Sequence, residues 1–242
     1  MTFDPAVLFQ FWPLIIKGFA VTIALFALSM VLSLILGVII ALIRQSRSVI
    51  LVWFAVFYIE LVRNIPFMIQ LYLVFFVLPF YGLHMPAFVV AVIVLTIYGS
   101  AYFAEIVRGA ILSVPKGQLE SARAVGMSYK QAMRRVIFPQ MLGYFFPPAT
   151  NQAIMQVKES CITSAITVSE LTMAAQYIQS ETYSPFEVFF VISLLYWLLS
   201  TGIVRSARWL EIKLQPDERR QRTLHIKNTP SRQNSFGRSD GL

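Results

Sequence analysis

The sequence has 242 residues, of which 57% are hydrophobic and only 13% are charged, and its mean hydropathy is +0.67. A soluble domain carries about 25% charged residues, so the composition excludes an ordinary soluble protein and indicates a membrane domain. One cysteine and two histidines are too few for a zinc site, an iron–sulfur site or an intrachain disulfide. The net charge of +8 would indicate a nucleic-acid-binding protein only if the basic residues formed a solvated surface.

The N-terminal residues 1–17 are predicted to be an external segment. Their start is acidic at Asp4, and the apolar run that follows is too long for the core of a secretory signal peptide. We therefore expect the first span to be retained in the mature protein.

Apolar stretches near the 20 residues that cross a bilayer recur five times along the chain. They predict an all-α integral membrane protein with five transmembrane helices, at about residues 18–43, 49–81, 87–107, 136–157 and 186–208. The second stretch is interrupted by polar residues and by Pro66, so we expect it to be a long, broken span.

The basic residues are distributed asymmetrically between the loops. With five spans, one side of the membrane holds 17 of the 20 lysines and arginines, and the opposite loops hold only Lys17. Basic residues are retained in the cytoplasm, so the N-terminus is predicted outside and the C-terminus inside. Because topology accounts for the positive charge, we expect no nucleic-acid partner.

The cytoplasmic loop 113–135 is predicted to have structure of its own. Residues 118–125 are good helix formers, and Gly126 follows where a left-handed C-terminal cap would lie. Ser128 and Gln131 have the spacing of a capping box, which starts a second helix. The loop is therefore predicted to form two short helices joined by a turn.

Ionisable residues at membrane depth usually face a cavity or the interior of a bundle. The second span contains Glu60, Arg63 and Asn64, and Glu60 and Arg63 share a helical face on which they could pair. A broken helix there could expose backbone groups to a polar solute. A purely structural ion pair is the alternative interpretation.

The fourth span and its end contain a second polar cluster, formed by Gln152, Gln156, Lys158, Glu159 and Ser160. We interpret the amides as a cavity wall, with interhelical hydrogen bonding that fixes a dimer of two such chains as the alternative. Glu159 could receive the ammonium group of an amino acid, and Lys158 or Arg63 its carboxylate.

The hydroxyl-rich residues 160–169 indicate a re-entrant or broken helical segment. Glu105 and Arg108 are expected to pair near the membrane surface and anchor the loop.

The C-terminal residues 214–242 contain few apolar side chains, too few to offset chain entropy by burial, and are predicted to be a disordered cytoplasmic tail. The chain has no Gly-rich phosphate loop and no Gly-x-Ser-x-Gly elbow, so neither ATP hydrolysis nor serine hydrolysis is expected. The classes of membrane protein that remain are conduits, receptors and scaffolds.

Several motifs resemble one known family. Glu120-Ser121-Ala122, then Gly126, then Pro139, resemble the "EAA" signature of the permease subunits of bacterial ABC importers. Glu105-Ile-Val-Arg108, Lys116-Gly117-Gln118, Lys158-Glu159-Ser160 and the stretch 58–66 are similar to the polar amino acid permeases of the histidine, glutamine and arginine type. Ser121 replaces the usual alanine, Asn64 and Ile65 replace the usual glycine and threonine, and Cys161 stands where a serine is common.

The resemblance implies an ABC type I importer permease fold in the bacterial cytoplasmic (inner) membrane. The expected partners are cytoplasmic ABC ATPase subunits, a second permease subunit, an external or periplasmic solute-binding protein, membrane lipid and a small polar solute. This chain would have no ATPase site or cofactor of its own, because the partner ATPase binds ATP and Mg. The residues expected to couple to the ATPase are Lys116, Gly117, Gln118, Glu120, Ser121, Ala122, Gly126 and Pro139.

Alternating access for an amino acid or similar solute, driven by the ATPase through residues 118–126, is therefore the expected function. The rival is an ion-coupled secondary amino acid transporter in which Glu60 or Glu159 titrates. Such folds usually have inverted repeats and more spans. A non-transporting scaffold would not need the polar residues of the second and fourth spans.

Overall fold

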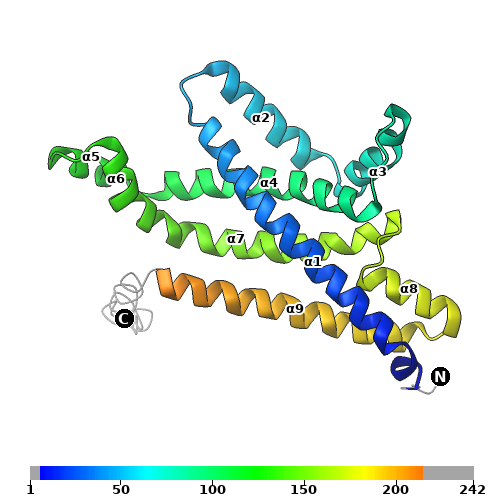
Figure 1. The fold of residues 1–242 in the computed structure, drawn as a ribbon. Coiled ribbons are helices and arrows are strands. Elements are labelled where there is room, and N and C mark those ends of the chain that lie inside the picture. Colours follow the sequence, from blue (N-terminus) through cyan, green and yellow to red (C-terminus); the bar gives the residue numbers. More distant parts are fainter. Residues whose placement is uncertain (1–5, 215–242) are drawn as a thin grey trace, which may run out of the picture.

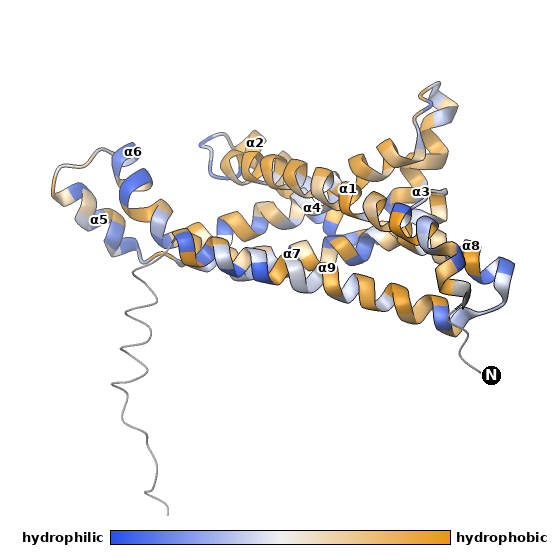
Figure 2. Ribbon diagram, turned by 60° about the horizontal axis from the view of Figure 1, so that its bottom comes forward, coloured by the Kyte–Doolittle hydropathy of each residue, from blue (hydrophilic) through white to orange (hydrophobic). Residues whose placement is uncertain are grey.

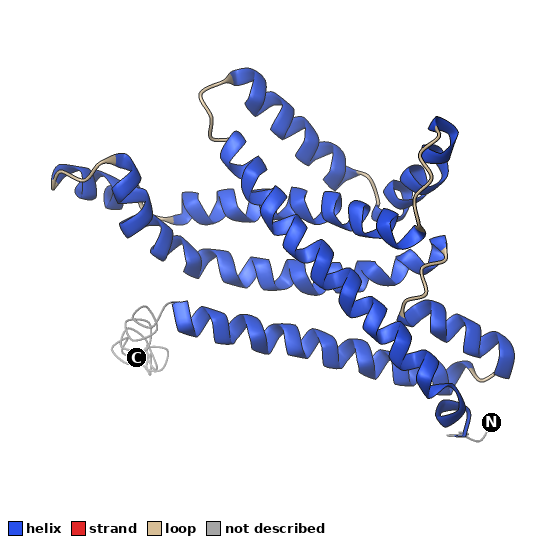
Figure 3. Cartoon of the chain, viewed as in Figure 1, coloured by secondary structure: helices blue, strands red, loops and turns tan. Residues whose placement is uncertain are grey.

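The computed structural model describes residues 6–214, which form helices joined by short loops, with no strand among them (Figure 3). The elements in chain order are α1 (Ala6–Ile43), α2 (Val49–Asn64), α3 (Phe67–Val77), η1 (Leu78–Tyr81), α4 (Ala87–Ser113), α5 (Lys116–Ala124), α6 (Tyr129–Ala132), η2 (Met133–Ile137), α7 (Phe138–Ser160), η3 (Cys161–Ile166), α8 (Leu171–Thr182) and α9 (Pro185–Leu214).

Three long helices, α4, α7 and α9, run side by side, and α1 crosses them obliquely (Figure 1). The short helices α5 and α6 project at one end, where α9 also finishes, whereas η1, α8 and the start of α1 lie at the other end. Hydrophilic residues are prominent on α5 and α6, whereas α1 and α2 are mostly hydrophobic (Figure 2). This contrast separates a membrane-embedded body from a polar end.

Helix α1 packs on its neighbours through a row of small, buried residues that includes Gly18, Thr22, Ser29, Ser33 and Gly37. In lipid, helices associate by close van der Waals packing, which small residues permit. The crossing with α4 is tight, since a Cβ atom added to Gly37 would lie 2.5 Å from the Cβ atom of Phe103. The position therefore requires glycine.

The break predicted in the second span is confirmed. Helices α2 and α3 meet at an angle of 102° around Pro66, which cannot donate a backbone hydrogen bond. The Gln70 Nε2 atom donates to the carbonyls of Val62 and Ile65, each at 2.7 Å. A side-chain amide thus satisfies the carbonyls that the break releases, as a membrane environment requires.

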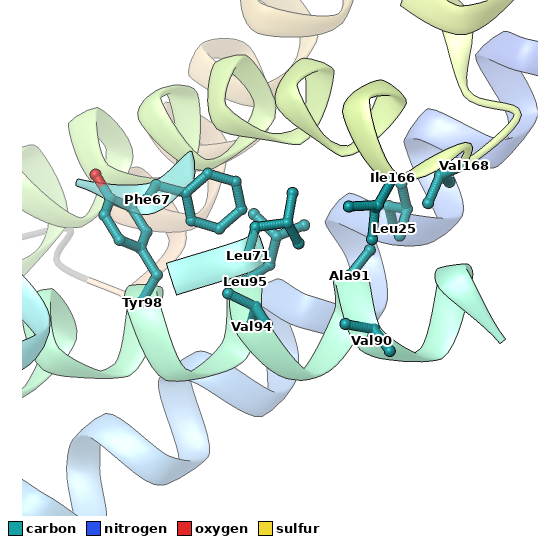
Figure 4. Close-up of a cluster of buried hydrophobic side chains, with 10 residues drawn as sticks. All are labelled: Leu25, Phe67, Leu71, Val90, Ala91, Val94, Leu95, Tyr98, Ile166 and Val168. Atoms are coloured by element: carbon teal, nitrogen blue, oxygen red, sulfur yellow. The ribbon is translucent and has the colours of Figure 1, made fainter. Parts of the chain in front are cut away.

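The largest group of buried apolar side chains joins α1, α3, α4 and the segment after α7 (Figure 4). Leu71 of α3 and Leu95 of α4 are fully buried in it, together with Leu25 of α1. Tyr98 lies at one end of this group, with Phe67 beside its ring. The bent α3 is thereby fixed against α4.

The first and last helices are longer than the predicted spans 18–43 and 186–208, since α1 begins at Ala6 and α9 ends at Leu214. Lys17 therefore lies within a helix and not in a separate segment. Residues 1–5 and nearly all of the predicted tail, residues 215–242, lie outside the described residues. Helix α8 was not predicted at all.

Within residues 6–214, three helices are long and apolar enough to cross a membrane, namely α1, α4 and α9. The bent pair α2 and α3 becomes a fourth span if it is counted as one. Helix α7 occupies the place of the expected span 136–157, but it is less apolar because it contains four amide and charged side chains between Gln152 and Glu159.

Candidate functional site

The predicted helix, turn, helix of the loop is confirmed. Gly126 has a φ of +89°, the left-handed conformation expected after the first helix. Ser128 and Gln131 form a complete capping box at the start of α6. Ala122 of α5 is buried, with 6% of its surface exposed, so it packs inward and does not belong to the outer face of the loop.

The outer face of α5 is polar and open. Leu119 packs toward the buried cluster of Ala110, Val114, Ile137 and Met141, and the opposite side of the helix is left exposed. The Gln118 Oε1 atom accepts a hydrogen bond of 3.2 Å from Gln140 Nε2 of α7. The exposed members of the predicted coupling set are Lys116, Gly117, Gln118, Glu120, Ser121, Gly126 and, in the first turn of α7, Pro139.

Glu105 forms the expected pair with Arg108, at 2.7 Å, and also an ion pair with Arg44 at the end of α1. This carboxylate thus joins α1 to α4 just before the loop. Burial and the neighbouring Arg108 lower the pKa of Arg44, whereas Glu60 raises it. Glu60 therefore lies within electrostatic reach of this group of charges.

Arg63 makes a different contact from the one predicted. Its guanidinium lies over the ring of Tyr102, 5.2 Å from the centroid, and no ion pair joins it to Glu60 in the described part of the chain. Tyr102 packs in turn against Tyr98, with centroids 4.9 Å apart. The Glu159 carboxylate is close enough to Tyr98 to interact with it electrostatically.

Arg63 thus joins α2 to α4, and Glu159 lies on α7, which packs against α4. We call Arg63, Tyr98, Tyr102 and Glu159 the pathway cluster. It contains a cation, two aromatic rings and a carboxylate. Arg63 is exposed, Tyr102 and Glu159 are half-buried, and Tyr98 is buried. Lys158, the neighbour of Glu159, is exposed as well.

Gln156 has an interior position that its sequence context did not indicate. It is fully buried, and its Nε2 atom donates to Ser29 Oγ at 2.9 Å and Ser33 Oγ at 3.2 Å on α1. A Cβ atom on Gly99 of α4 would lie 2.6 Å from Gln156 Oε1. Gln156 therefore forms interhelical hydrogen bonds, but within one chain and not between two subunits, and among the described residues it lines no cavity.

The remaining predicted residues are dispersed. Asn64 is exposed and donates to the carbonyl of Glu60 at 2.7 Å, whereas Ser160 is buried and donates to the carbonyl of Val157. Gln152 is buried, and its Nε2 atom has no hydrogen-bond partner among the described residues. Neither Ser160 nor Gln152 is exposed to a solute in this conformation.

Sequence reasoning missed three residues of this region. Tyr98 and Tyr102 are one helical turn apart in an otherwise apolar span, and that spacing was a usable signal. Glu170 is fully buried, accepts hydrogen bonds from Met173 N and the Tyr196 hydroxyl, and so caps α8 and ties it to α9. No sequence pattern indicated that a carboxylate after the hydroxyl-rich segment would be buried.

The chain matches the family described as "Binding-protein-dependent transport system inner membrane component" over residues 33–215. The chain belongs to this family. It is therefore a multi-pass protein of the bacterial inner membrane, as the resemblance implied, and a transport component with apolar spanning helices.

Curated relatives and solved structures agree with the match. The probable glutamine ABC transporter permease protein GlnM of Bacillus subtilis is 34% identical over 210 residues, covering 87% of this chain and 97% of that protein. The L-cystine transport system permease protein TcyB of the same organism is 35% identical, covering 78% and 82%. A crystal structure of an amino acid ABC transporter with histidines has a TM-score of 0.82 at 36% identity, covering 88% of this chain and 100% of that one.

Proposed function

We propose that this chain is the permease subunit of an ABC importer that translocates an amino acid or a similar small polar solute. The observation that carries the proposal is the pathway cluster, in which the Arg63 guanidinium lies over Tyr102 and the ring of Tyr102 packs on that of Tyr98. Glu159 supplies the opposite charge from α7, which packs on α4. The printed names of its relatives, which are permeases for glutamine, L-cystine and other amino acids, support the same substrate class.

An amino acid has chemistry complementary to this cluster. Its ammonium group would pair with the Glu159 carboxylate, and its carboxylate would pair with the Arg63 guanidinium, which offers planar, bidentate donors. The half-buried ring of Tyr102 would contact the substrate's side chain, and the buried ring of Tyr98 behind it would help to exclude water. Such charged hydrogen bonds are worth about 1.5–3 kcal/mol each, enough to decide recognition.

The proposed topology keeps five spans, with the N-terminus outside and the C-terminus inside. Helix α7 would be the fourth span, because neighbouring helices and not lipid surround Gln152 and Gln156. The end that holds α5 and α6 would then face the cytoplasm. The distribution of the basic residues supports this orientation.

Coupling to ATP hydrolysis would occur through α5. Its exposed residues would enter a groove of a cytoplasmic ATPase that binds ATP and Mg, and the contact between Gln118 and Gln140 would transmit movement to α7. Two permease subunits would open a shared pathway alternately to the outside and to the cytoplasm. An external solute-binding protein would deliver the solute to this pathway. Family membership favours this arrangement over an ion-coupled secondary transporter.

The proposal is tested by purifying the chain with its ATPase and measuring ATP hydrolysis in nanodiscs with the binding protein and a panel of amino acids. Stimulation by one amino acid or a related group would support it. An ATPase that fails to copurify, or hydrolysis that no member of the panel changes, would contradict it.

A further inference from the structure

A large apolar groove lies between α1, α7 and α9. Its volume is about 670 Å³, and residues from all three helices line it, including Phe26, Met30, Phe145, Leu199, Gly202 and Ile203. A Cβ atom added to Gly202 would meet nothing within 4 Å, so the groove is open at that point. Family membership does not explain this groove, and neither does the pathway cluster.

The groove faces away from the proposed pathway. On α7 it is lined by Phe146, Ala149 and Ala153. At 100° per residue, Glu159, the member of the pathway cluster on this helix, lies about 110° around the helix axis from these three residues. An occupant of the groove would therefore contact the surrounding membrane and not the solute.

One end of the groove is cationic. Ser206 and Leu210 line both the groove and a second hollow of about 410 Å³, whose other lining residues are Arg205 and Trp209. Lys213 lies over the Trp209 ring, 5.0 Å from its centroid, which adds a second cation nearby. An apolar groove that ends at basic and tryptophan side chains has the chemistry of a lipid-binding site at the membrane interface.

We propose that this groove binds one anionic phospholipid of the cytoplasmic leaflet. An acyl chain would lie between α1 and α9, and the phosphate would pair with Arg205. The orientation of the lipid depends on the proposed topology, but occupancy of the groove does not. Helix α1 crosses α9 obliquely (Figure 1), and the bound chain would fill the groove that residues of the two helices line.

The test uses the assembled transporter in nanodiscs of phosphatidylcholine that contain a phosphatidylglycerol with a photoreactive group on its acyl chain. Mass spectrometry then locates the labelled peptides. We expect label on α1 and α9 beside the groove, at least tenfold above that from a photoreactive phosphatidylcholine. Gly202→Phe should abolish this label by filling the groove, whereas Ser193→Phe, on the opposite face of α9, should retain it.

Arg205→Gln should lower phosphatidylglycerol labelling to the phosphatidylcholine level, and Arg208→Gln, an exposed arginine of the same helix, should not. Equal labelling by both lipids, or labelling that Gly202→Phe leaves unchanged, would overturn the proposal. Cysteines at Leu199 that cross-link two copies of the chain would overturn it as well, since a second copy would then fill the groove. Because ATPase copurification is recorded for each variant, failure of the lipid site is distinguishable from failure of the proposed function.

Discussion

Arg63 illustrates how a neighbour from another helix can replace a local pairing. Glu60 and Arg63 have the spacing for an ion pair on α2, yet the guanidinium lies over Tyr102 of α4. A cation–π contact of an exposed cation is worth about 0.5–1 kcal/mol, more than an exposed ion pair at this spacing, which gives about 0.2–0.5 kcal/mol. The contact leaves the donors at the rim of the guanidinium available to a carboxylate.

Replacing Glu159 with glutamine tests the role of the pathway cluster. The neutral amide keeps the shape but loses the charge that would bind an ammonium group, so uptake should fall about tenfold or more, since charged hydrogen bonds contribute about 1.5–3 kcal/mol. The loss should be greatest for a cationic amino acid. Uptake of radiolabelled amino acids into proteoliposomes measures it.

The matched control is Glu181→Gln, which neutralises an exposed carboxylate on α8 and should leave uptake unchanged. If Glu159→Gln transports the whole panel as well as the unmodified protein, then Glu159 is only a charge at the end of α7.

The close crossing of α1 and α4 predicts a stability effect at Gly37. Gly37→Ala would place a Cβ atom 2.5 Å from that of Phe103, an overpacking that costs about 1–3 kcal/mol. Gly202→Ala, where space is open, should be neutral or stabilising by up to about 1 kcal/mol. Thermal unfolding of the two variants in one detergent compares them, and equal melting would contradict the tight crossing.

At the scale of helices, local chemistry determined what could be predicted. The break at Pro66, the left-handed Gly126 and the capping box of Ser128 and Gln131 each depend on a few neighbouring residues, and each is present in the structure. Helix α8 depends on a buried cap, Glu170, whose partner Tyr196 lies on another helix. That dependence is not visible in the sequence around it.

The candidate site was predicted in part for the same reason. Charged residues within spans were found because they are rare there, which identified Arg63 and Glu159. Burial of Gln156 depends on Ser29 and Ser33, which are more than a hundred residues earlier in the chain. Only the packing of α1 on α7 reveals that contact.

The α5 segment carries its own prediction, which concerns docking. Gly126→Val forces a β-branched residue into a left-handed conformation that costs about 1–2 kcal/mol, so the turn after α5 should change and ATPase binding should weaken. Copurification with a tagged ATPase measures binding. Gly109→Ala on α4, where space is open, is the control and should bind normally.

Glu120→Lys extends this test to charge without altering the turn. It should also reduce copurification, because it reverses an exposed charge on the proposed docking face. Normal copurification of both the Gly126 and the Glu120 variants, with membrane insertion intact, would argue against α5 as the docking element.

For the whole molecule, the proposed orientation rests on the basic residues, of which the five-span topology places 17 of the 20 on one side of the membrane. In a chain whose native Cys161 is replaced by serine, single cysteines at Gly82 and Leu83, in the loop before α4, should therefore react with an impermeant reagent from outside. Cysteines at Lys116 and Lys130 should react only after the membrane is opened. Labelling of Lys116→Cys in intact cells would contradict the proposed orientation.

The energy source of transport distinguishes an ABC importer from an ion-coupled secondary transporter most directly. The chain, its ATPase and its binding protein would be reconstituted in proteoliposomes, and uptake of the stimulating amino acid would be measured. For an ABC importer, uptake should require hydrolysable ATP and persist when proton and sodium gradients are collapsed. Uptake driven by an ion gradient without ATP would contradict it.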